Sequence, residues 1–494
     1  MSERRLPPWT VLGPAFLILS AVTYPTFVPD DLYIYLQFVR NLLDGAGPSF
    51  NPGHPTYGFT SALWLGVLTA AGGVSRHLEA AARVASAATA VAALAGIGTL
   101  ARRLSGSRVA GWVAAALLAL DAWFLRWATT GMESMAAVAL LTGGFARRER
   151  EDAAGLSPVG STALFALLAL VRPEAFLLLA LSLADAALPR SDTGGSWRPR
   201  RAARALTTAV VLVGPWMLYA AVRFGTAVPD TAPAKGVPGA AVVRIAESLI
   251  RIAGLGGITV GIPVLLLAFA AVTAGGPARR AALARHRLLA AWLVSLPLLY
   301  ALTGVKVYSR YLLLVTPLWL AAGLAAGRWA AAGRWRGAWW AAAAAAALGN
   351  LVLTFGWVAP ASRAYGRSFR AVNVALGEWL ATHTATDALV AAENIGAIAF
   401  HSRRRILDMN GLISPEVIPF KRAGRVDAYL EKHPPDYVIK IDPRPDPWSS
   451  GGPALDLEVL RILPYEHMFI DQKAPLYYTL YRVRDGTDGK PVVR

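Results

Sequence analysis

Two adjacent carboxylates, Asp30 and Asp31, form the pattern in this sequence that most directly indicates chemistry. They follow an apolar segment and precede an amphipathic stretch at 32–43. Because neighbouring side chains on a helix point about 100° apart, one of the two is the better general base. The other would orient it, bind a substrate hydroxyl or hold a metal. Alternatively the pair caps the following helix, where acidic side chains satisfy free N–H groups, and both interpretations can hold together.

Other polar residues gather at the ends of apolar segments. Arginine and lysine bind phosphate, so Arg172, Lys235 and Arg310 are candidates for holding an anion such as a lipid phosphate. The alternative for each alone is contact with membrane headgroups. The predicted substrate-binding residues are Asn51, Tyr57, Thr60, Glu133, Arg172, Glu174, Asp230, Lys235, Tyr308 and Arg310. The carboxylates would permit a divalent cation but do not require one, so the metal is left unassigned.

The composition shows which elements must position these residues. Hydrophobic residues make up 55% of the chain and charged residues 16%, with a mean hydropathy of +0.43. Soluble domains carry about 25% charged residues, so this balance indicates a membrane protein. Several segments are nearly free of charge and close to the roughly 20 residues that cross a bilayer as a helix, among them 11–28, 78–100, 205–222 and 339–358.

The net charge of +18 is concentrated in the apolar part. Of the 49 basic and 31 acidic residues, 18 and 16 follow residue 359, which leaves an excess of +16 before it and +2 after it. Basic residues among membrane loops are a topological signal, so we predict membrane lipids and no nucleic acid as partners. The chain has no cysteine, which excludes disulfides, thiolate metal sites and cysteine nucleophiles.

Arginine-rich connections define the predicted cytoplasmic side. They lie near residues 4–5, 102–108, 147–150, 190–204, 279–287 and 328–336. The loop 29–60 is then predicted to lie outside the cytoplasm and residue 101 inside it, so only one net crossing can separate them. Two apolar runs, however, lie between them. We read the shorter run, 59–73, as a juxtamembrane helix. About eleven spans follow, at 8–28, 78–100, 109–125, 131–146, 157–171, 173–188, 205–222, 255–274, 288–303, 308–326 and 337–358.

The segment 360–494 has a soluble composition. An apolar run at 386–393, the segment 405–408 before an Asn-Gly turn, and the runs 436–441 and 477–483 predict strands. A short amphipathic helix is expected at 426–432. The fold class is therefore a polytopic α-helical membrane protein, residues 1–359, with a C-terminal α/β domain. An odd number of spans places the N-terminus in the cytoplasm and this domain outside it.

Several of these segments together resemble one known family. The first outer loop is similar to that of GT-C glycosyltransferases, with matching residues at Asp30, Asp31, Tyr33, Tyr35, Arg40, Asn41, Gly45, Gly47, 50–53, 57–61 and Trp64. The segments 130–133, 172–174, 223–235 and 310–313 follow in the same order, and 395–416 resembles an extracytoplasmic domain of the same branch. This branch includes the mycobacterial terminal β-(1→2)-arabinofuranosyltransferase. It often has Asn where Asp230 stands, and the loop after Asn51 is short here.

The resemblance implies an inverting glycosyltransferase of a bacterial plasma membrane. The donor would be a sugar on a polyprenyl phosphate, possibly arabinofuranose, and the acceptor a glycan or another part of the cell envelope. It implies Asp30 as the base, Asp31 and Glu133 as supporting carboxylates, and Lys235, Arg310 and Arg172 as phosphate or sugar ligands. No separate cofactor is implied beyond the divalent cation that some GT-C enzymes need.

Alternatives remain within and outside this class. A protein O-mannosyltransferase or a lipid A-type sugar transferase would share the same architecture, but these usually have Asp-Glu in the first loop. A transporter or flippase for a lipid-linked substrate would instead be expected to show paired repeats and midplane charges, which this sequence lacks.

Overall fold

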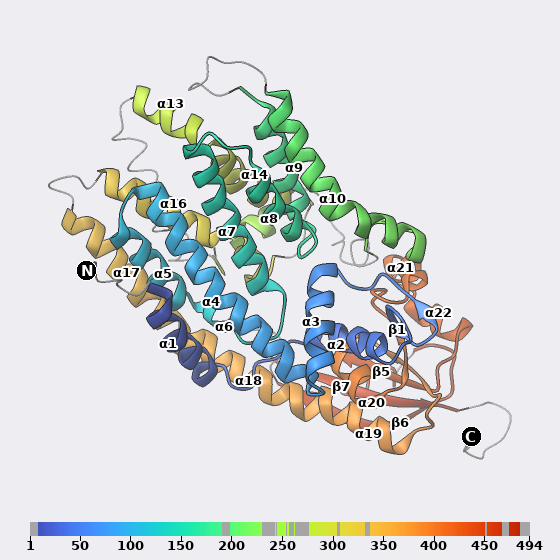
Figure 1. Ribbon diagram of the computed structural model, residues 1–494. Helices are drawn as coiled ribbons and strands as arrows, with labels where there is room; N and C mark the ends of the chain where they lie inside the picture. Colours follow the sequence, from blue (N-terminus) through green and yellow to red (C-terminus); the bar gives the residue numbers. More distant parts are fainter. Residues whose placement is uncertain are drawn as a thin grey trace.

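The computed structural model describes residues 8–189, 198–229, 276–303, 307–330, 336–449, 452–466 and 474–484, and parts of 243–261. The molecule has two parts, a bundle of helices and a C-terminal α/β domain at one end of it (Figure 1). The helices of the bundle are α1 Pro8–Thr23, α4 Leu78–Ser105, α5 Arg108–Leu120, α6 Ala122–Trp127, α7 Ser134–Ala153, α8 Val159–Ala169, α9 Ala175–Ala187, α10 Pro199–Phe224, α13 Gly276–Arg285, α14 Arg287–Thr303, α15 Ser309–Leu312, α16 Thr316–Ala330 and α17 Arg336–Leu353.

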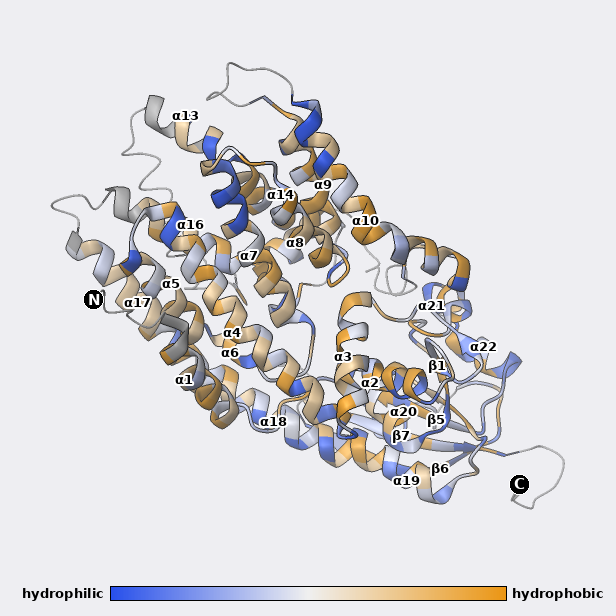
Figure 2. Cartoon of the chain, viewed as in Figure 1, coloured by the Kyte–Doolittle hydropathy of each residue, from blue (hydrophilic) through white to orange (hydrophobic). Residues whose placement is uncertain are grey.

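The bundle is built for an apolar solvent. Large apolar side chains point outward from its helices, including Ile18 on α1 and Val222 on α10, which are 66% and 79% exposed. Figure 2 shows apolar colour along the bundle helices, with hydrophilic residues near the upper ends of α7 and α10. Exposed apolar surface of this kind is stable only against lipid.

Helices occupy most of the predicted spans. Within the described residues, three of them are long and apolar enough to cross a membrane: Leu78–Ser105, Pro199–Phe224 and Gly337–His383. Shorter apolar helices cover most of the other predicted segments, whereas 255–274 lies almost entirely outside the described residues. The membrane fold is therefore confirmed, and the count of eleven crossings stays a prediction.

Small residues bring the central helices of the bundle into close contact. A Cβ added at Gly111 of α5 would lie 2.6 Å from the carbonyl oxygen of Gly98 on α4. A Cβ at Gly96 would lie 2.2 Å from the hydroxyl of Thr142 on α7. Such close approach strengthens helix packing in lipid, where no hydrophobic effect drives helices together.

One continuous helix joins the two parts of the molecule. It runs over Gly337–His383, through α17, the π-helical turn η2 Thr354–Val358, α18 Ala359–Phe369, a second π-helical turn η3 Arg370–Val374 and α19 Ala375–His383. The predicted boundary between residues 359 and 360 falls inside this helix. The two parts are thus joined by a rigid element rather than by a linker.

The C-terminal domain is a five-stranded mixed sheet in the order β4-β3-β5-β7-β6. The strands β3 Leu389–Ala392, β4 Arg405–Asp408 and β5 Tyr437–Asp442 are parallel, while β7 Leu476–Val483 and β6 Leu457–Tyr465 are added antiparallel. Helices α20 Gly396–Ser402, α21 Ile418–Arg422 and α22 Val426–Lys432 connect them, with the 3-10 turn η4 Pro415–Val417 before α21. The four predicted strands and the helix at 426–432 are confirmed, whereas β6 and α20 were not predicted.

The first outer loop lies between the bundle and the C-terminal domain. It contains α2 Asp30–Leu43 and the short strands β1 Ser49–Asn51 and β2 His54–Pro55, and it is followed by α3 Ala62–Val74 (Figure 1). Helices are thus present at both predicted segments, 32–43 and 59–73. Gly58 marks a close approach, because a Cβ there would lie 2.6 Å from Ile413 of the C-terminal domain.

Candidate functional site

An ion pair joins the first outer loop to the bundle. Asp31, in the first turn of α2, accepts a contact of 2.7 Å from Nη1 of Arg310 on α15. The aspartate side chain is 42% exposed and the arginine side chain 11% exposed. The carboxylate thus stands at the surface of the site, and its guanidinium partner lies beneath it.

A second group of charges lies in the connection between α6 and α7 and in the connection between α8 and α9. Arg172 donates to Glu133 at 3.0 Å and to Glu174 at 3.1 Å, using its two terminal nitrogens. The hydroxyl of Tyr300 on α14 donates to Glu174 at 3.3 Å. Glu133 and Arg172 are only 2% and 5% exposed, so this is a buried network.

Tyr311 connects the two groups. Its ring centre is 4.8 Å from the guanidinium carbon of Arg172 and 5.6 Å from that of Arg310. The ring also stacks on Tyr300. These cation–π contacts use the faces of the guanidiniums, so they add to the ion pairs that both arginines make with carboxylates. We call Asp31, Glu133, Arg172, Glu174, Tyr300, Arg310 and Tyr311 the domain-side cluster, because α2 packs on α20 of the C-terminal domain.

The cluster is incompletely hydrogen-bonded. Among the described residues, Oε2 of Glu133, Oε2 of Glu174 and Nε of Arg310 are buried and have no hydrogen-bond partner. Buried polar atoms are nearly always paired, so unpaired ones at one place indicate a site for a polar ligand. The cluster combines acceptors for hydroxyl groups with cations for an anion.

Asp30 points away from this cluster. Its carboxylate accepts hydrogen bonds from the backbone N–H groups of Gly396 at 2.9 Å and Ala397 at 2.8 Å, and so it caps the N-terminus of α20. Burial raises the pKa of Asp30 to about 6, although these two hydrogen bonds act to lower the pKa. The alternative that the pair caps the following helix is therefore wrong for Asp30, because its carboxylate caps α20, far along the chain, instead of α2. Of the two aspartates, Asp31 therefore pairs with Arg310 of the cluster, whereas Asp30 pairs with α20.

Two predicted residues of the first loop, Asn51 and Tyr57, make structural contacts instead of facing the cluster. Asn51 pairs with the backbone of Ile406 on the edge strand β4, donating at 2.7 Å and accepting at 2.9 Å. Tyr57 accepts from Trp216 at 2.8 Å and stacks on Phe224. These contacts dock the loop onto the C-terminal sheet and onto α10.

Thr60 and Tyr308 lie at the margins of the cluster. The hydroxyl of Thr60 is 3.4 Å from that of Tyr35. Tyr308 directly precedes α15, is 40% exposed and makes an edge contact with Tyr311. Asp230 and Lys235 lie outside the described residues.

A metal centre is not evident in the part of the chain that the structure describes, because no group of three or more His, Asp or Glu side chains comes together there. The carboxylates of the cluster are instead paired with arginine. Sequence reasoning missed Tyr300 as a contact of the site. Tyr311 was part of the Arg-Tyr-Leu-Leu motif, and its place next to Arg310 was the signal that could have identified its role.

The fold of this chain is that of a known class of membrane enzymes. ArnT from Cupriavidus metallidurans, solved with undecaprenyl phosphate, matches with a TM-score of 0.55 and 14% identity over 95% of this chain and 98% of its own. An Archaeoglobus fulgidus oligosaccharyltransferase matches with a TM-score of 0.55 and 14% identity over 87% and 69%. The mycobacterial arabinofuranosyltransferase AftD matches with a TM-score of 0.53 and 16% identity over 96% of this chain and 41% of its own. These structural neighbours are GT-C glycosyltransferases.

Sequence comparison adds less. Residues 362–482 match a family described as "Domain of unknown function (DUF8728)", which covers most of the C-terminal domain. No curated protein matches the chain in sequence.

Proposed function

We propose that this protein is an inverting glycosyltransferase that moves a sugar from a polyprenyl-phosphate donor to an acceptor of the cell envelope. The observation that carries the proposal is the domain-side cluster, in which an exposed carboxylate, two buried guanidiniums and unpaired carboxylate oxygens meet. A transferase of this kind needs a base for the acceptor hydroxyl and cations for the leaving phosphate. The GT-C fold supports the same class.

In this proposal Asp31 is the general base. Its carboxylate takes the proton of the acceptor hydroxyl as that oxygen attacks the anomeric carbon from the face opposite the phosphate. The bond between the anomeric carbon and the phosphate oxygen breaks, and its electron pair leaves with the lipid phosphate. One displacement inverts the configuration and requires no covalent intermediate.

Arg310 and Arg172 would stabilise the negative charge that develops on the phosphate. Arg310 touches Asp31 in the free protein, and a bound phosphate would compete for the same guanidinium. Donor binding would then draw Arg310 from the base and leave Asp31 free to accept a proton. Lys235, which lies outside the described residues, is expected to add to this anion site.

Glu133 and Glu174 would position the sugar. Each keeps one carboxylate oxygen without a partner among the described residues while the other oxygen holds Arg172. A sugar hydroxyl that donates to such an oxygen would complete its hydrogen bonding.

We place the cluster and the C-terminal domain on the extracytoplasmic side of a bacterial plasma membrane, with the N-terminus in the cytoplasm. One observation, read with the positive-inside rule, supports this orientation. Arginine-rich connections from α7, α10 and α14 meet at the opposite end of the bundle, as the pairs Arg201–Asp152 and Arg287–Asp185 show. Basic residues of membrane loops favour the cytoplasm.

The sugar could be arabinofuranose, and AftD among the structural neighbours is consistent with this. A lipid A-type transferase is the second candidate, because ArnT matches over nearly the whole of both chains. To decide, purified protein would be incubated with a panel of polyprenyl-phosphate sugars, including arabinofuranose and aminoarabinose donors, with cell-envelope fractions as acceptors. Transfer from one donor with inversion supports the proposal.

A flippase for a lipid-linked substrate is the alternative outside enzymology. Sealed vesicles that contain the protein would separate the two functions. Movement of a polyprenyl-phosphate sugar between leaflets without release of polyprenyl phosphate would contradict the proposed transferase.

A further inference from the structure

We propose that a groove between α4 and α7, at the end of the bundle remote from the C-terminal domain, binds the headgroup of an anionic phospholipid. The groove has a volume of about 290 Å³. Small residues form its walls, and Thr99, Arg103, Arg147 and Arg150 line it as well. This proposal is independent of the proposed glycosyl transfer.

The walls of the groove suit an acyl chain. Gly96 allows α4 and α7 to approach closely, since a Cβ there would meet the hydroxyl of Thr142 at 2.2 Å. At Gly143 the space is open, because the nearest atom to an added Cβ is 3.9 Å away on Leu164. The small residues Ala95, Gly96, Gly143 and Ala146 thus leave an uncharged part of the groove beside its arginines.

The arginines at the end of the groove are not neutralised within the described part of the protein. Arg103 and Arg150 make no ion pair there, and Nε of Arg103 is buried without a hydrogen-bond partner. The guanidinium of Arg103 lies in the field of Arg102, Arg147 and Arg150, with Glu149 as the one nearby acid. Glu149 contacts His286 at 2.8 Å, so it has a partner of its own.

Arg147 does not change the excess of positive charge around the groove. It pairs with Glu151 at 2.9 Å, but Glu151 also accepts hydrogen bonds from the backbone N–H groups of Gly160 and Ser161. Several guanidiniums around one groove repel one another and attract a phosphate, which each can bind through two N–H groups. Basic pockets between membrane helices are a known form of headgroup site.

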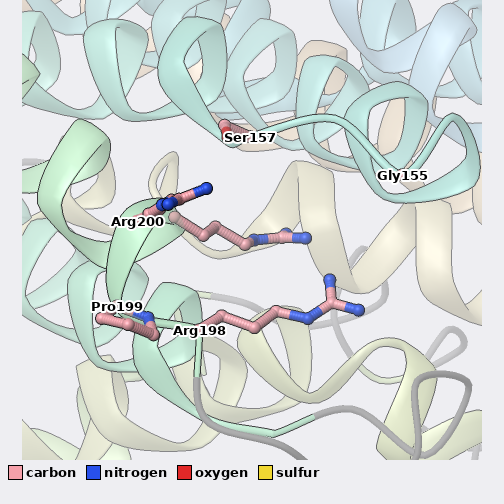
Figure 3. Close-up of a pocket in the computed structure, with 6 residues that line it drawn as sticks. Gly155, Ser157, Arg198, Pro199 and Arg200 are labelled. Atoms are coloured by element: carbon pink, nitrogen blue, oxygen red, sulfur yellow. The ribbon is translucent and has the colours of Figure 1, made fainter.

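A second hollow at the same end provides a matched control. It has a volume of about 420 Å³ and lies between the α7–α8 connection, with Gly155 and Ser157, and the start of α10, with Arg198 and Arg200 (Figure 3). It matches the groove in basic residues but not in its walls, because it lies beside a connection instead of between two packed helices, and its third arginine, Arg201, pairs with Asp152 at 2.6 Å. Removing Arg198 and Arg200 changes the net charge by the same amount as removing Arg103 and Arg150.

The test is lipid retention by the purified full-length protein. Protein delipidated in detergent would be given phosphatidylglycerol or phosphatidylcholine at equal concentration, and bound lipid counted by native mass spectrometry. We expect wild-type protein to retain phosphatidylglycerol preferentially. The variant R103Q/R150Q should lose about tenfold or more in retention, whereas R198Q/R200Q should stay close to wild type.

A third variant, G143L, fills the groove without a change in charge and should also lose retention. Equal loss in both double variants would mean general attraction to basic residues and would overturn the proposal. Loss only in R198Q/R200Q, or equal retention of phosphatidylcholine, would overturn it as well. Inorganic phosphate that raises the melting temperature as much as phosphatidylglycerol would reject the lipid in favour of a free anion.

Discussion

Buried arginine–carboxylate networks stand at both ends of the bundle, and among the described residues they differ in whether both oxygens of each carboxylate have a partner. At the end remote from the C-terminal domain, Asp152 uses its two oxygens for Arg148 and Arg201, and Asp185 uses its two for Arg148 and Arg287. Glu151 is also engaged through both oxygens. We call this group the far-end network. In the domain-side cluster, Glu133 and Glu174 each keep an oxygen without a partner among the described residues.

The difference distinguishes ion pairs that stabilise the fold from a cluster that is able to bind a ligand. Buried charge alone is no evidence for a site, because ion pairs that satisfy each other can join helices. Burial that leaves acceptors unpaired has a cost, and a ligand that completes the hydrogen bonds removes it. The domain-side cluster also has an exposed carboxylate, because the side chain of Asp31 is 42% exposed. In the far-end network, by contrast, the side chain of Asp185 is only 5% exposed.

The largest expected effect is at Asp31. Replacing it by Asn removes the proposed base and should lower the rate of transfer roughly 10²–10⁴-fold, while the protein still inserts and folds. The neighbouring variant D30N is the comparison, because Asp30 contacts α20 instead of the cluster, so any loss of rate there should be smaller and should accompany a loss of stability. Initial rates with the active donor would be compared at equal amounts of folded protein. If D30N abolishes transfer and D31N does not, Asp30 is the base, as the sequence implied.

The second prediction compares one glutamate from each end. E133Q removes the charge beside the unpaired oxygen of the cluster and should lower the rate roughly 10–100-fold, with a smaller change in melting temperature than E151Q because Arg172 keeps its pair with Glu174. E151Q places an amide N–H against the N–H groups of Gly160 and Ser161. It should lower the free energy of unfolding by about 1–3 kcal/mol.

Transfer per folded molecule should be unchanged in E151Q. Rates and thermal melts of both variants in the same detergent check whether E133Q mainly lowers activity and E151Q mainly lowers stability. Two variants that lose activity and stability in the same proportion would remove the distinction between the two networks.

The sequence was sufficient to predict the elements and several members of the cluster, but not how the first loop is held. Apolar spacing predicted the bundle helices and four strands of the sheet, and Glu133, Arg172, Glu174 and Arg310 do meet. Asp30 and Asn51 were assigned to the site, whereas their partners are Gly396 and Ile406, hundreds of residues away. Local rules for helices and strands contain no information on such contacts.

The strand β6 was missed for a related reason. It is an edge strand, Leu457–Tyr465, with mixed burial and a proline at position 464, so its side chains do not alternate clearly between apolar and polar. It is stabilised by pairing with β7 along its length. Its identity therefore depends on a neighbour that the local pattern does not reveal.

The third prediction concerns the contact that holds α2 in place. A Cβ at Gly396 would lie 2.1 Å from the carbonyl oxygen of Asp30. G396A should therefore push α2 away from α20, lower the free energy of unfolding by about 1–3 kcal/mol, and reduce transfer by displacing Asp31. Gly66 of α3 is the control, because nothing lies within 4 Å of a Cβ there. Should G396A behave like G66A in melting and in rate, the C-terminal domain does not position the base.

The smallest effect is a dependence of stability on pH. The pKa values of Asp30 and Asp408 are raised to about 6, chiefly by burial. Because a raised pKa means that the folded state binds the proton more tightly than the unfolded state, each group makes stability fall as pH rises from about 4 to about 6. D30N removes one of the two contributions, so its melting temperature should fall less steeply over this range than that of wild type. Parallel curves of melting temperature against pH for the two proteins would show that the Asp30 carboxylate does not hold its proton more tightly in the folded protein. The contact between Asp30 and α20 would then be independent of pH.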